Sequence, residues 1–333
     1  MNSSENEKLQ IAIATGGQSD PDSWERSLRT VEHADNLGMH SVWLPEGHFR
    51  VGATASPLPI LAAFANRTKQ IRLATTSILL PIHHPLRVAA EVATLDTLSG
   101  GRVIVGLGRG FQTPVFQGFG INQNSKRDRF DEALDIILTA WSGNSFKLDG
   151  TFYPSLEGKS VRVALKPLQK PHPPLVVAAF GPKGLKQAAD RSLPYLASPL
   201  ETLPVLTENY AIWKKHLKSP IPTGSLRAPV MRTLFVSENK NVVKRVATAL
   251  ENDAMRPKAK APAALARAAS GNMDERTLVG GVDEVVASLN IYRKALDMDL
   301  LVARAHPPGA NQAECENSLE LLVNKVAPAV RTN

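Results

Sequence analysis

Two arginines near the middle of the chain have the surroundings of an anion-binding site. Arg109 lies between Gly108 and Gly110, just after a β-branched run at residues 103–105 that has the pattern of a buried strand. Glycines let the backbone approach an anion closely. Arg127 lies at the expected start of the next helix, whose free amides add positive potential. The pattern predicts half of a phosphate clamp; a tight turn with two solvated arginines is the alternative.

A second candidate anion site follows a later expected strand. The turn Gly181-Pro182-Lys183-Gly184 precedes a predicted helix. Its free amides, the Lys183 ammonium and the helix dipole would together attract negative charge. The same four residues are also a common connection between a strand and a helix, so both interpretations stay open.

Three histidines and a glutamate follow expected strands, and two of the histidines, His48 and His84, are the candidates for proton transfer. Glu46 and His48 follow the second expected strand, and His83 and His84 follow the third. Histidine changes charge near neutral pH and can therefore serve as a general acid or base. The alternatives are a structural role for His48 and helix capping for the other two. Residues 75–77 end the third strand with hydroxyls that either line a polar ligand or cap the sheet.

Common motifs of other enzyme classes are absent from the sequence. GLGRG at residues 106–110 does not match GxGxxG, and we expect no strongly helical segment before Ser125, which argues against a Rossmann site. No spacing of His, Cys, Asp and Glu recommends a metal site. No GxSxG nucleophile elbow occurs.

The composition is that of an ordinary globular protein. With 43% hydrophobic and 21% charged residues, the 333-residue chain could form two average domains or one large α/β barrel. The net charge of +8 is dispersed and aromatic residues make up 5%, so we expect an anionic small molecule as partner and no nucleic acid.

The cellular setting is predicted from the cysteine count and from the distribution of apolar residues. The single Cys315 fits a reducing compartment, so we expect a cytoplasmic protein. No apolar run is long enough to span a membrane. The polar first residues, 1–8, are predicted to be a disordered tail and not a signal peptide.

Strand and helix patterns alternate along the chain. We expect strands at residues 9–15, 40–44, 71–79, 103–105, 175–180, 193–197, 230–236 and 299–303. We expect helices at 21–37, 57–67, 85–98, 125–141, from 185 onward, at 202–217, 281–296 and 312–326, and a helical segment at 242–270 that the proline-containing run 255–265 interrupts. Eight strands alternating with helices predict a single (β/α)8 TIM barrel over residues 9–330, with a doubly wound sheet as the rival.

Two segments interrupt this alternation. Residues 143–173 are rich in glycine and proline, and we interpret them as an insertion with a small hairpin. Residues 252–275 contain lysines and prolines and are the predicted lid. In a barrel the chemistry lies at the C-terminal ends of the strands. Glu46, His48, the two histidines at 83–84, Arg109 and the GPKG turn all follow expected strands, so we expect them to share one rim.

The order of these motifs resembles the bacterial luciferase-like, flavin-dependent monooxygenase family. The resemblance is carried by SVWLPEGHF at 41–49, ATTSILLPIHHPLRVAAEVATLDTLSGGRVIVGLGRGF at 74–111 and LVGGVDEVVASL at 278–289, and extends over nearly the whole chain. It implies a TIM barrel that binds reduced FMN delivered by a separate NAD(P)H-dependent flavin reductase. The implied reaction uses O2, through a C4a-(hydro)peroxyflavin, to oxygenate a small hydrophobic organic substrate such as an aldehyde or ketone.

The resemblance also implies roles for particular residues. The arginines and the GPKG turn would hold the FMN phosphate, and Thr76 and Ser77 match the position of a non-proline cis peptide under the isoalloxazine ring. The implied cofactor-binding residues are Thr76, Ser77, Arg109, Arg127, Gly181, Lys183 and Gly184. The helices at 57–67 and 85–98 pair two barrels in the family, which implies a homodimer.

His48 falls in the family's Glu-His-His-Phe motif, but the chain departs from the family at two positions. Gly47 replaces the first histidine of that motif, and Gly108 replaces a cysteine of luciferase. We therefore expect no light emission, and the acid–base residue stays open between His48 and His84. The alternatives are a deazaflavin-dependent oxidoreductase, a flavin-binding protein without turnover, and a barrel that acts on a sugar phosphate.

Overall fold

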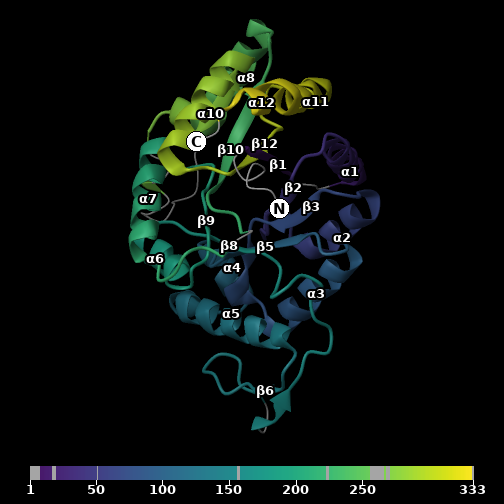
Figure 1. The fold of residues 1–333 in the computed structure, drawn as a ribbon, viewed down its shortest axis with the longest axis vertical. Coiled ribbons are helices and arrows are strands. Elements are labelled where there is room, and N and C mark those ends of the chain that lie inside the picture. The colour runs from purple at the N-terminus through teal and green to yellow at the C-terminus, as the bar shows by residue number, and fades with distance from the viewer. Residues whose placement is uncertain are drawn as a thin grey trace. The chain divides into compact units, whose positions relative to one another are not determined.

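Parallel strands followed by helices make up most of the chain (Figure 1). The computed structural model describes residues 8–16, 20–50, 52–155, 158–222, 225–255, 266–267 and 271–331. The chain divides into two units. The first unit comprises Met1–Thr15, Glu32–Trp43 and Val176–Asn333, and the second comprises Gly16–Val31 and Leu44–Leu175.

The sheet of the first unit is parallel. Its strands are β1 (Gln10–Ala14), β2 (Ser41–Leu44), β8 (Leu175–Ala178), β9 (Tyr195–Leu196), β10 (Pro229–Val236), β11 (Thr277–Gly280) and β12 (Leu300–Arg304). They pair in the order β11-β10-β12-β1-β2, with Met231 opposite Val302 and Ile11 opposite Leu301. A second pairing joins β8 to β9, and the bridge between Ala197 and Val230 links the end of β9 to β10.

Among its described residues, the second unit contains three parallel strands and a hairpin. The strands are β3 (Arg72–Thr75), β4 (Ile78–Leu79) and β5 (Val103–Gly108), and both β3 and β4 pair with β5. The hairpin is formed by β6 (Phe146–Lys147) and β7 (Ser160–Val161), which pair antiparallel. The predicted hairpin in the 143–173 insertion is therefore confirmed.

The helices follow the strands as the sequence predicts. Helix α1 (Pro21–Asn36) has residues in both units, and the second unit also contains α2 (Pro57–Arg67), η1 (Leu80–Ile82), α3 (Pro85–Leu98), α4 (Thr113–Gly118), η2 (Gln123–Ser125) and α5 (Lys126–Ser142). The first unit contains α6 (Pro182–Asp190), α7 (Leu203–His216), α8 (Lys240–Met255), η4 (Met273–Glu275), α10 (Val282–Leu296), α11 (Gln312–Leu321), the π-helical turn η5 (Leu322–Val326) and α12 (Ala327–Ala329). In the described part of the chain, no helix combines the length and the apolar character needed to cross a bilayer.

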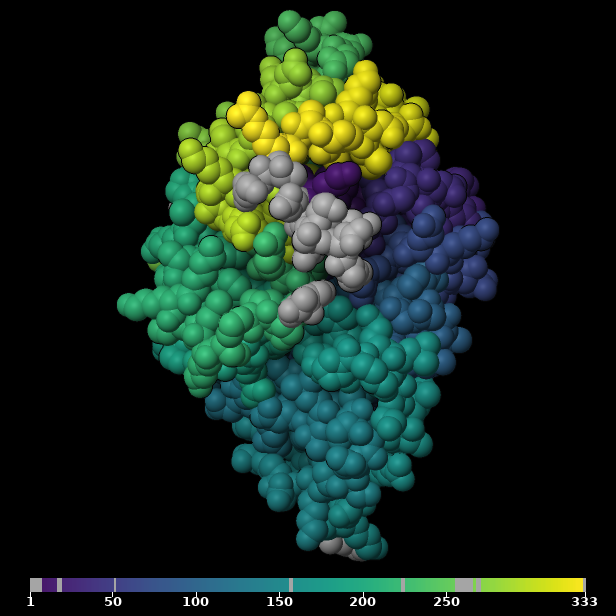
Figure 2. Space-filling view, viewed as in Figure 1, coloured from purple at the N-terminus to yellow at the C-terminus, as the bar shows by residue number. Residues whose placement is uncertain are grey.

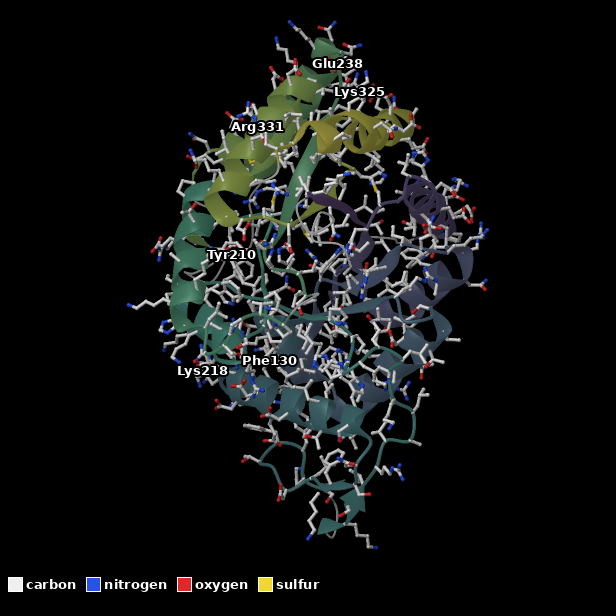
Figure 3. The ribbon with its side chains drawn as sticks, in the orientation of Figure 1. Phe130, Tyr210, Lys218, Glu238, Lys325 and Arg331 are labelled. Carbon is white, nitrogen blue, oxygen red and sulfur yellow. The ribbon has the colours of Figure 1, made fainter. Side chains whose placement is uncertain are left out.

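Proline and apolar periodicity explain the helix boundaries. Pro57, Pro85 and Pro182 occupy the first turns of α2, α3 and α6, where the missing N–H is not needed. Burial then selects the inner face of each helix: Phe130 of α5 and Tyr210 of α7 are buried, whereas side chains such as Lys325 lie at the surface (Figure 3).

Four local predictions differ from the structure. The strand expected at 71–79 is divided into β3 and β4, and the strand expected at 103–105 extends to Gly108. The short helix α4 begins three residues after GLGRG, although we expected no helix before Ser125. Strand β11 was not expected. Two of these differences involve glycines, at the ends of β5 and β11, where hydrogen bonds from neighbouring strands override the weak strand preference of glycine.

The predicted lid at 252–275 lies mostly outside the described residues. Within it, α8 continues to Met255 and η4 begins at Met273. The predicted tail at residues 1–8 is likewise outside the described residues except for Lys8. Both assignments stay predictions.

Candidate functional site

A buried carboxylate in the second unit connects two of the histidines expected from the sequence. Glu46 Oε1 accepts hydrogen bonds from His48 Nε2 and from His83 Nε2, each at 2.7 Å. Its Oε2 accepts the backbone N–H of Leu79, also at 2.7 Å. Glu46 follows β2 whereas His83 follows β4 and η1, so strand ends far apart in sequence meet at one carboxyl group.

The electrostatics of this group favour an ionised glutamate. Burial raises the pKa of Glu46, but the hydrogen bond and charge of His83, with the bonds from Leu79 and His48, together bring it below its ordinary value. A carboxylate only accepts hydrogen bonds, so each Nε2 carries a proton. When an imidazole of this pair is neutral, its Nδ1 is left as an acceptor and can take a proton from a ligand.

The two imidazoles differ in their exposure and neighbours. The His83 side chain is 33% exposed and that of His48 is 11% exposed. The His48 ring lies 4.9 Å from Phe119 and 5.8 Å from Phe49, and the Phe49 side chain is itself largely exposed. An apolar aromatic surface therefore adjoins the histidine pair.

His84 lies in a different environment. It precedes α3 without a side-chain capping bond, and its ring meets Tyr153 edge to face at 5.7 Å. The Arg129 guanidinium lies over the same tyrosine at 4.9 Å.

The structure joins His83 to His48 through Glu46, a pairing that the sequence did not assign. The available signal was that Glu46, His48 and His83 all follow neighbouring expected strands.

Arg109, Lys126 and Arg127 of the second unit form a group of cations, called here the cationic cluster. Burial, followed by the charge of Arg127, lowers the pKa of Arg109 to about 10, and Asp131 partly opposes this effect. Burial and the two arginines likewise lower the pKa of Lys126. These effects require the three cations to lie within electrostatic range of one another. A bound anion would relieve their repulsion, although the phosphate-binding role of the arginines stays a prediction.

The backbone between β3 and β4 lies against β5. The Thr76–Ser77 peptide bond is cis, as the family resemblance implies. Thr75 Oγ1 exchanges hydrogen bonds with the backbone of Gly106 at 2.8 and 2.9 Å, which holds the glycine segment in the sheet. A Cβ atom at Gly108 would lie 2.1 Å from Ser77 Oγ. Gly108 therefore provides the space that the Ser77 hydroxyl occupies.

The GPKG turn lies in the first unit. Gly181 has φ +73° and caps α6, so the helix begins at Pro182 and includes Lys183 in its first turn. The Gly184 N–H donates to Gly181 O at 3.1 Å. Because the arginines belong to the second unit, the expected meeting of GPKG with them around one phosphoryl group stays a prediction.

Among the described residues, no group of three or more His, Cys, Asp and Glu side chains is arranged to hold a metal ion. In the histidine pair, both Nε2 atoms are already directed at the same carboxylate oxygen. The chemistry that the described geometry can supply is therefore proton transfer and anion binding.

The family profile described as luciferase-like monooxygenase matches residues 8–297. The chain belongs to the luciferase-like monooxygenase family. One relative is the oxygenase component of a flavin-dependent trigonelline monooxygenase from Acinetobacter baylyi, 32% identical over 181 residues, which cover 53% of this chain and 49% of the relative. This luciferase-like chain spans about half the length of the curated relatives that it matches.

Several solved structures have the same fold over nearly the whole chain. The monooxygenase RslO1 from Streptomyces bottropensis has a TM-score of 0.82 at 26% identity, covering 96% of this chain and 99% of that one. The FMN-bound oxygenating constituent of 3,6-diketocamphane monooxygenase from Pseudomonas putida has a TM-score of 0.77 at 21% identity, covering 98% and 100%. An F420-dependent secondary alcohol dehydrogenase has a TM-score of 0.72 at 20% identity, covering 97% and 99%. The fold is therefore shared by proteins with different flavin-type cofactors.

Proposed function

We propose that this protein is the oxygenase component of a two-component monooxygenase that uses reduced FMN and O2. The observation that carries the proposal is the cationic cluster, in which burial and the charge of Arg127 lower the pKa of Arg109, and burial and both arginines lower the pKa of Lys126. Three coupled cations in one place fit a phosphate monoester, the anionic end of FMN. The match to the family profile supports the same cofactor type.

The residues of the second unit fit the rest of the cofactor. Thr76 and Ser77 would lie against the isoalloxazine ring, since Gly108 leaves their loop close to β5. Arg109 and Arg127 would hold the phosphate, joined by Gly181, Lys183 and Gly184 of the first unit. When bound, reduced FMN supplies the electrons that activate O2.

The proposed fold for this site is the closed (β/α)8 barrel. The Ala197–Val230 bridge supports closure, because it joins β9 to β10 in parallel. In such a barrel the C-terminal strand ends form one rim. The single domain over residues 9–330 belongs to the same proposal.

The protein's own chemistry would be proton handling beside the flavin. His48 and His83, held by Glu46, present Nδ1 acceptors next to the aromatic surface of Phe49 and Phe119. This arrangement supports a substrate with an apolar body, such as an aldehyde or ketone. We favour the His48–His83 pair for proton transfer, with His84 as the second candidate.

Partners and setting follow from the same proposal. A separate NAD(P)H-dependent flavin reductase would deliver reduced FMN, and O2 would be the second substrate. The trigonelline relative is named an oxygenase component, which supports a two-component system. We also propose a homodimer and a cytoplasmic location, with no nucleic-acid or membrane partner.

The test compares FMN with riboflavin, which has no phosphate. We expect wild-type protein to bind FMN more tightly, and the Arg109→Gln and Arg127→Gln variants to lose about tenfold or more in FMN affinity while riboflavin affinity stays unchanged. Flavin fluorescence quenching measures both ligands, and Arg87→Gln on the exposed face of α3 is the matched control. Equal binding of FMN and riboflavin would contradict the proposed phosphate site.

A kinetic experiment separates the alternatives. Stopped-flow absorbance follows reduced FMN mixed with the protein and O2, and a monooxygenase is expected to delay flavin reoxidation. When an organic substrate of the enzyme is added, flavin reoxidation is expected to lose this delay. Immediate reoxidation unaffected by the protein favours a flavin-binding protein without turnover, and preference for the deazaflavin F420 over FMN favours the hydride-transfer alternative.

A further inference from the structure

Two side chains at the end of the last strand point the same way and are not used in the proposed flavin site. Arg304 ends β12, and His306 follows two residues later. Both residues are exposed, whereas Ala303, which precedes Arg304, and Ala305, which separates Arg304 from His306, are buried. This alternation is that of an extended chain, so Arg304 and His306 lie on one face.

The neighbouring strand identifies that face. Thr233 of β10 is the register partner of Arg304, and Arg304 Nη1 donates to Thr233 Oγ1 at 3.4 Å. The preceding residue, Arg232, points the other way, because its Nε donates to the Tyr292 hydroxyl of α10 at 2.8 Å. Arg304, His306 and Thr233 therefore share the sheet face opposite to α10.

Few contacts are made by the Arg304 guanidinium within the part of the chain that the structure describes. Among the described residues, the contact with Thr233 is its one hydrogen bond, and no carboxylate lies within ion-pair distance of it. A guanidinium carries five N–H donors, so a bidentate ligand can still be bound. Burial lowers the pKa of Arg304, and the charge of Asp253 of α8 opposes this shift. Solvent still reaches part of the Arg304 side chain. The guanidinium is therefore surrounded by protein on several sides and open to solvent on another.

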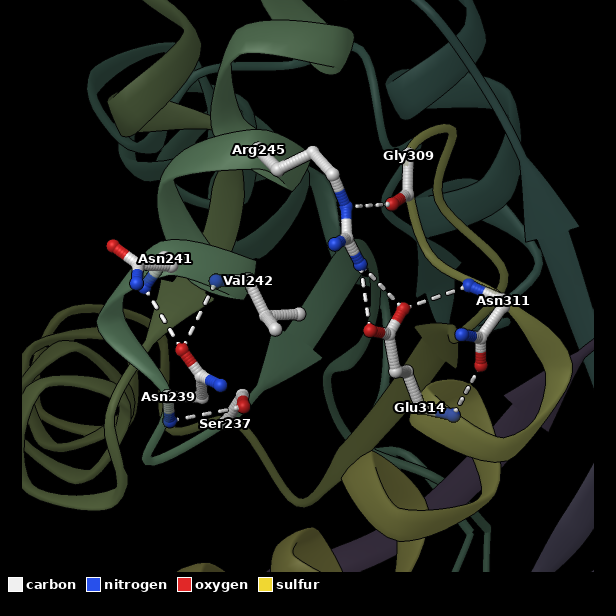
Figure 4. Close-up of polar contacts among 8 residues, drawn as sticks. All are labelled: Ser237, Asn239, Asn241, Val242, Arg245, Gly309, Asn311 and Glu314. Atoms are coloured by element: carbon white, nitrogen blue, oxygen red, sulfur yellow. Dashed lines mark hydrogen bonds and ion pairs between the residues drawn. The ribbon is translucent and has the colours of Figure 1, made fainter.

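The loop that carries His306 is held against α8. Arg245 of α8 donates from Nε to Gly309 O at 2.8 Å and from Nη2 to both carboxylate oxygens of Glu314 at 2.6 Å (Figure 4). Asn311 and Glu314 cap α11 reciprocally. Gly309 lies so close to α8 that a Cβ atom there would be 2.8 Å from Ala249 Cβ. In the space-filling view, the C-terminal segment, in yellow, lies next to green segments that precede it in the chain (Figure 2). The loop is thus fixed in place.

We propose that Arg304, with Thr233 and His306, binds the carboxylate of an organic acid that is the substrate. The inference rests on the proposed function, since β12 ends at the strand edge where a barrel enzyme carries its chemistry. A planar carboxylate matches the guanidinium fork, the Thr233 hydroxyl supplies one further donor, and the His306 imidazole another. The substrate then has an apolar body and an acidic end.

The experiment measures binding of carboxylates and of their neutral isosteres to the FMN-loaded protein. Isothermal titration calorimetry uses benzoate and octanoate as probes, with benzamide and octanamide as matched neutral ligands. We expect the carboxylates to bind about tenfold or more tightly than the amides, and Arg304→Gln to remove that preference. Arg304→Lys should retain part of it, because it keeps the charge and loses the fork.

Control variants separate this effect from a general loss of charge or of folding. Arg227→Gln makes the same change at a half-exposed arginine of the first unit and should leave the carboxylate preference intact. If Arg304→Gln does not fold, Thr233→Val replaces it and should weaken carboxylate binding about threefold by removing one donor. Carboxylates that bind no better than amides, or that bind Arg304→Gln and wild type equally, would overturn the inference.

FMN binding is measured separately on the same variants. Arg304→Gln is expected to bind FMN as the wild type does, and a loss of FMN affinity would overturn the inference by assigning Arg304 to the cofactor. If the wild-type protein binds neither FMN nor F420 but retains an Arg304-dependent preference for carboxylates, the proposed function fails and the anion site stands.

Discussion

At the scale of single residues, the site depends on one carboxylate that two imidazoles share. Glu46 orients His48 and His83 because its carboxylate accepts a hydrogen bond from the Nε2–H of each imidazole. The Glu46 side chain is only 1% exposed, so a neutral replacement leaves buried donors without a charged acceptor. The position of both histidines therefore follows from this one residue.

Glu46→Gln is expected to lower the free energy of unfolding at pH 7 by about 2 kcal/mol, because two bonds to a charged group are weakened. The folded-state pKa of Glu46 is below its unfolded value, so its contribution is present above about pH 4.5 and is lost as the pH falls through the folded pKa. Urea unfolding at pH 7 and at pH 4 measures both effects, and the difference between variant and wild type should shrink at the lower pH. Glu25→Gln, at an exposed ion pair of α1, is the control and should change little.

Gly108→Ala is expected to destabilise the protein by about 1–3 kcal/mol and to weaken FMN binding, because the new methyl group displaces Ser77. Thermal unfolding and flavin fluorescence measure the two effects. Gly47→Ala is the control, since its Cβ would have no neighbour closer than 3.5 Å. Adding Ser77→Ala to Gly108→Ala should recover part of the stability; unchanged FMN binding by Gly108→Ala alone would show that this contact is not needed.

At the scale of secondary-structure elements, a buried polar network holds α7 to β9. Glu201 accepts the Tyr195 hydroxyl, the Asn209 side-chain amide at 2.6 Å and the Ser198 N–H at 2.7 Å. Burial raises the pKa of Glu201 to about 7, although these three donors and Arg232 oppose the shift. The attachment of α7 to the sheet is therefore sensitive to pH.

Glu201→Gln is expected to destabilise the protein more at pH 5 than at pH 8. In the wild type, the folded protein keeps the Glu201 proton up to about pH 7, whereas the unfolded chain releases it near 4.5, so wild-type stability falls across this interval. The variant lacks this titration, and its deficit should shrink by about 1–3 kcal/mol between the two pH values. Urea unfolding measures it. The control is Glu208→Gln on the exposed face of α7. If Glu201→Gln lost the same stability at both pH values, the pKa of Glu201 in the folded protein would be an ordinary one.

At the scale of the whole molecule, the single cysteine reports on unfolding. Cys315 is buried on the inner face of α11, and burial, with Glu314 and Glu316, raises the pKa of its thiol to about 11. Both effects make the native thiol unreactive. Reaction at this position therefore requires α11 to leave the first unit.

We expect a disulfide reagent such as DTNB to label the native protein at pH 8 at least about a hundredfold more slowly than the urea-unfolded chain. Absorbance of the released thiolate measures the rate. In a Cys315→Ser background, Asn317→Cys on the exposed side of α11 should react at once and serves as the positive control. Rapid labelling of the native wild type would show that α11 opens locally.

The sequence by itself determined the elements whose signals are local. Helix α3 begins at Pro85 and ends at Leu98 as predicted, because proline sets its first turn and two glycines follow its end. The parallel α/β class followed from alternating periodicities, and the family followed from the motifs at 41–49 and 74–111.

Only the tertiary structure decided the features that depend on neighbours distant along the chain. The glycines of β5 became strand because Thr75 bonds Gly106 from 31 residues away. His48 and His83 form a pair because both contact Glu46, which lies 37 residues before His83. Arg304 points to one face of the sheet because its register partner is Thr233. Local patterns record backbone preference and burial, whereas these contacts arise only when strands pair, and the energy of that pairing exceeds the preference of any single residue.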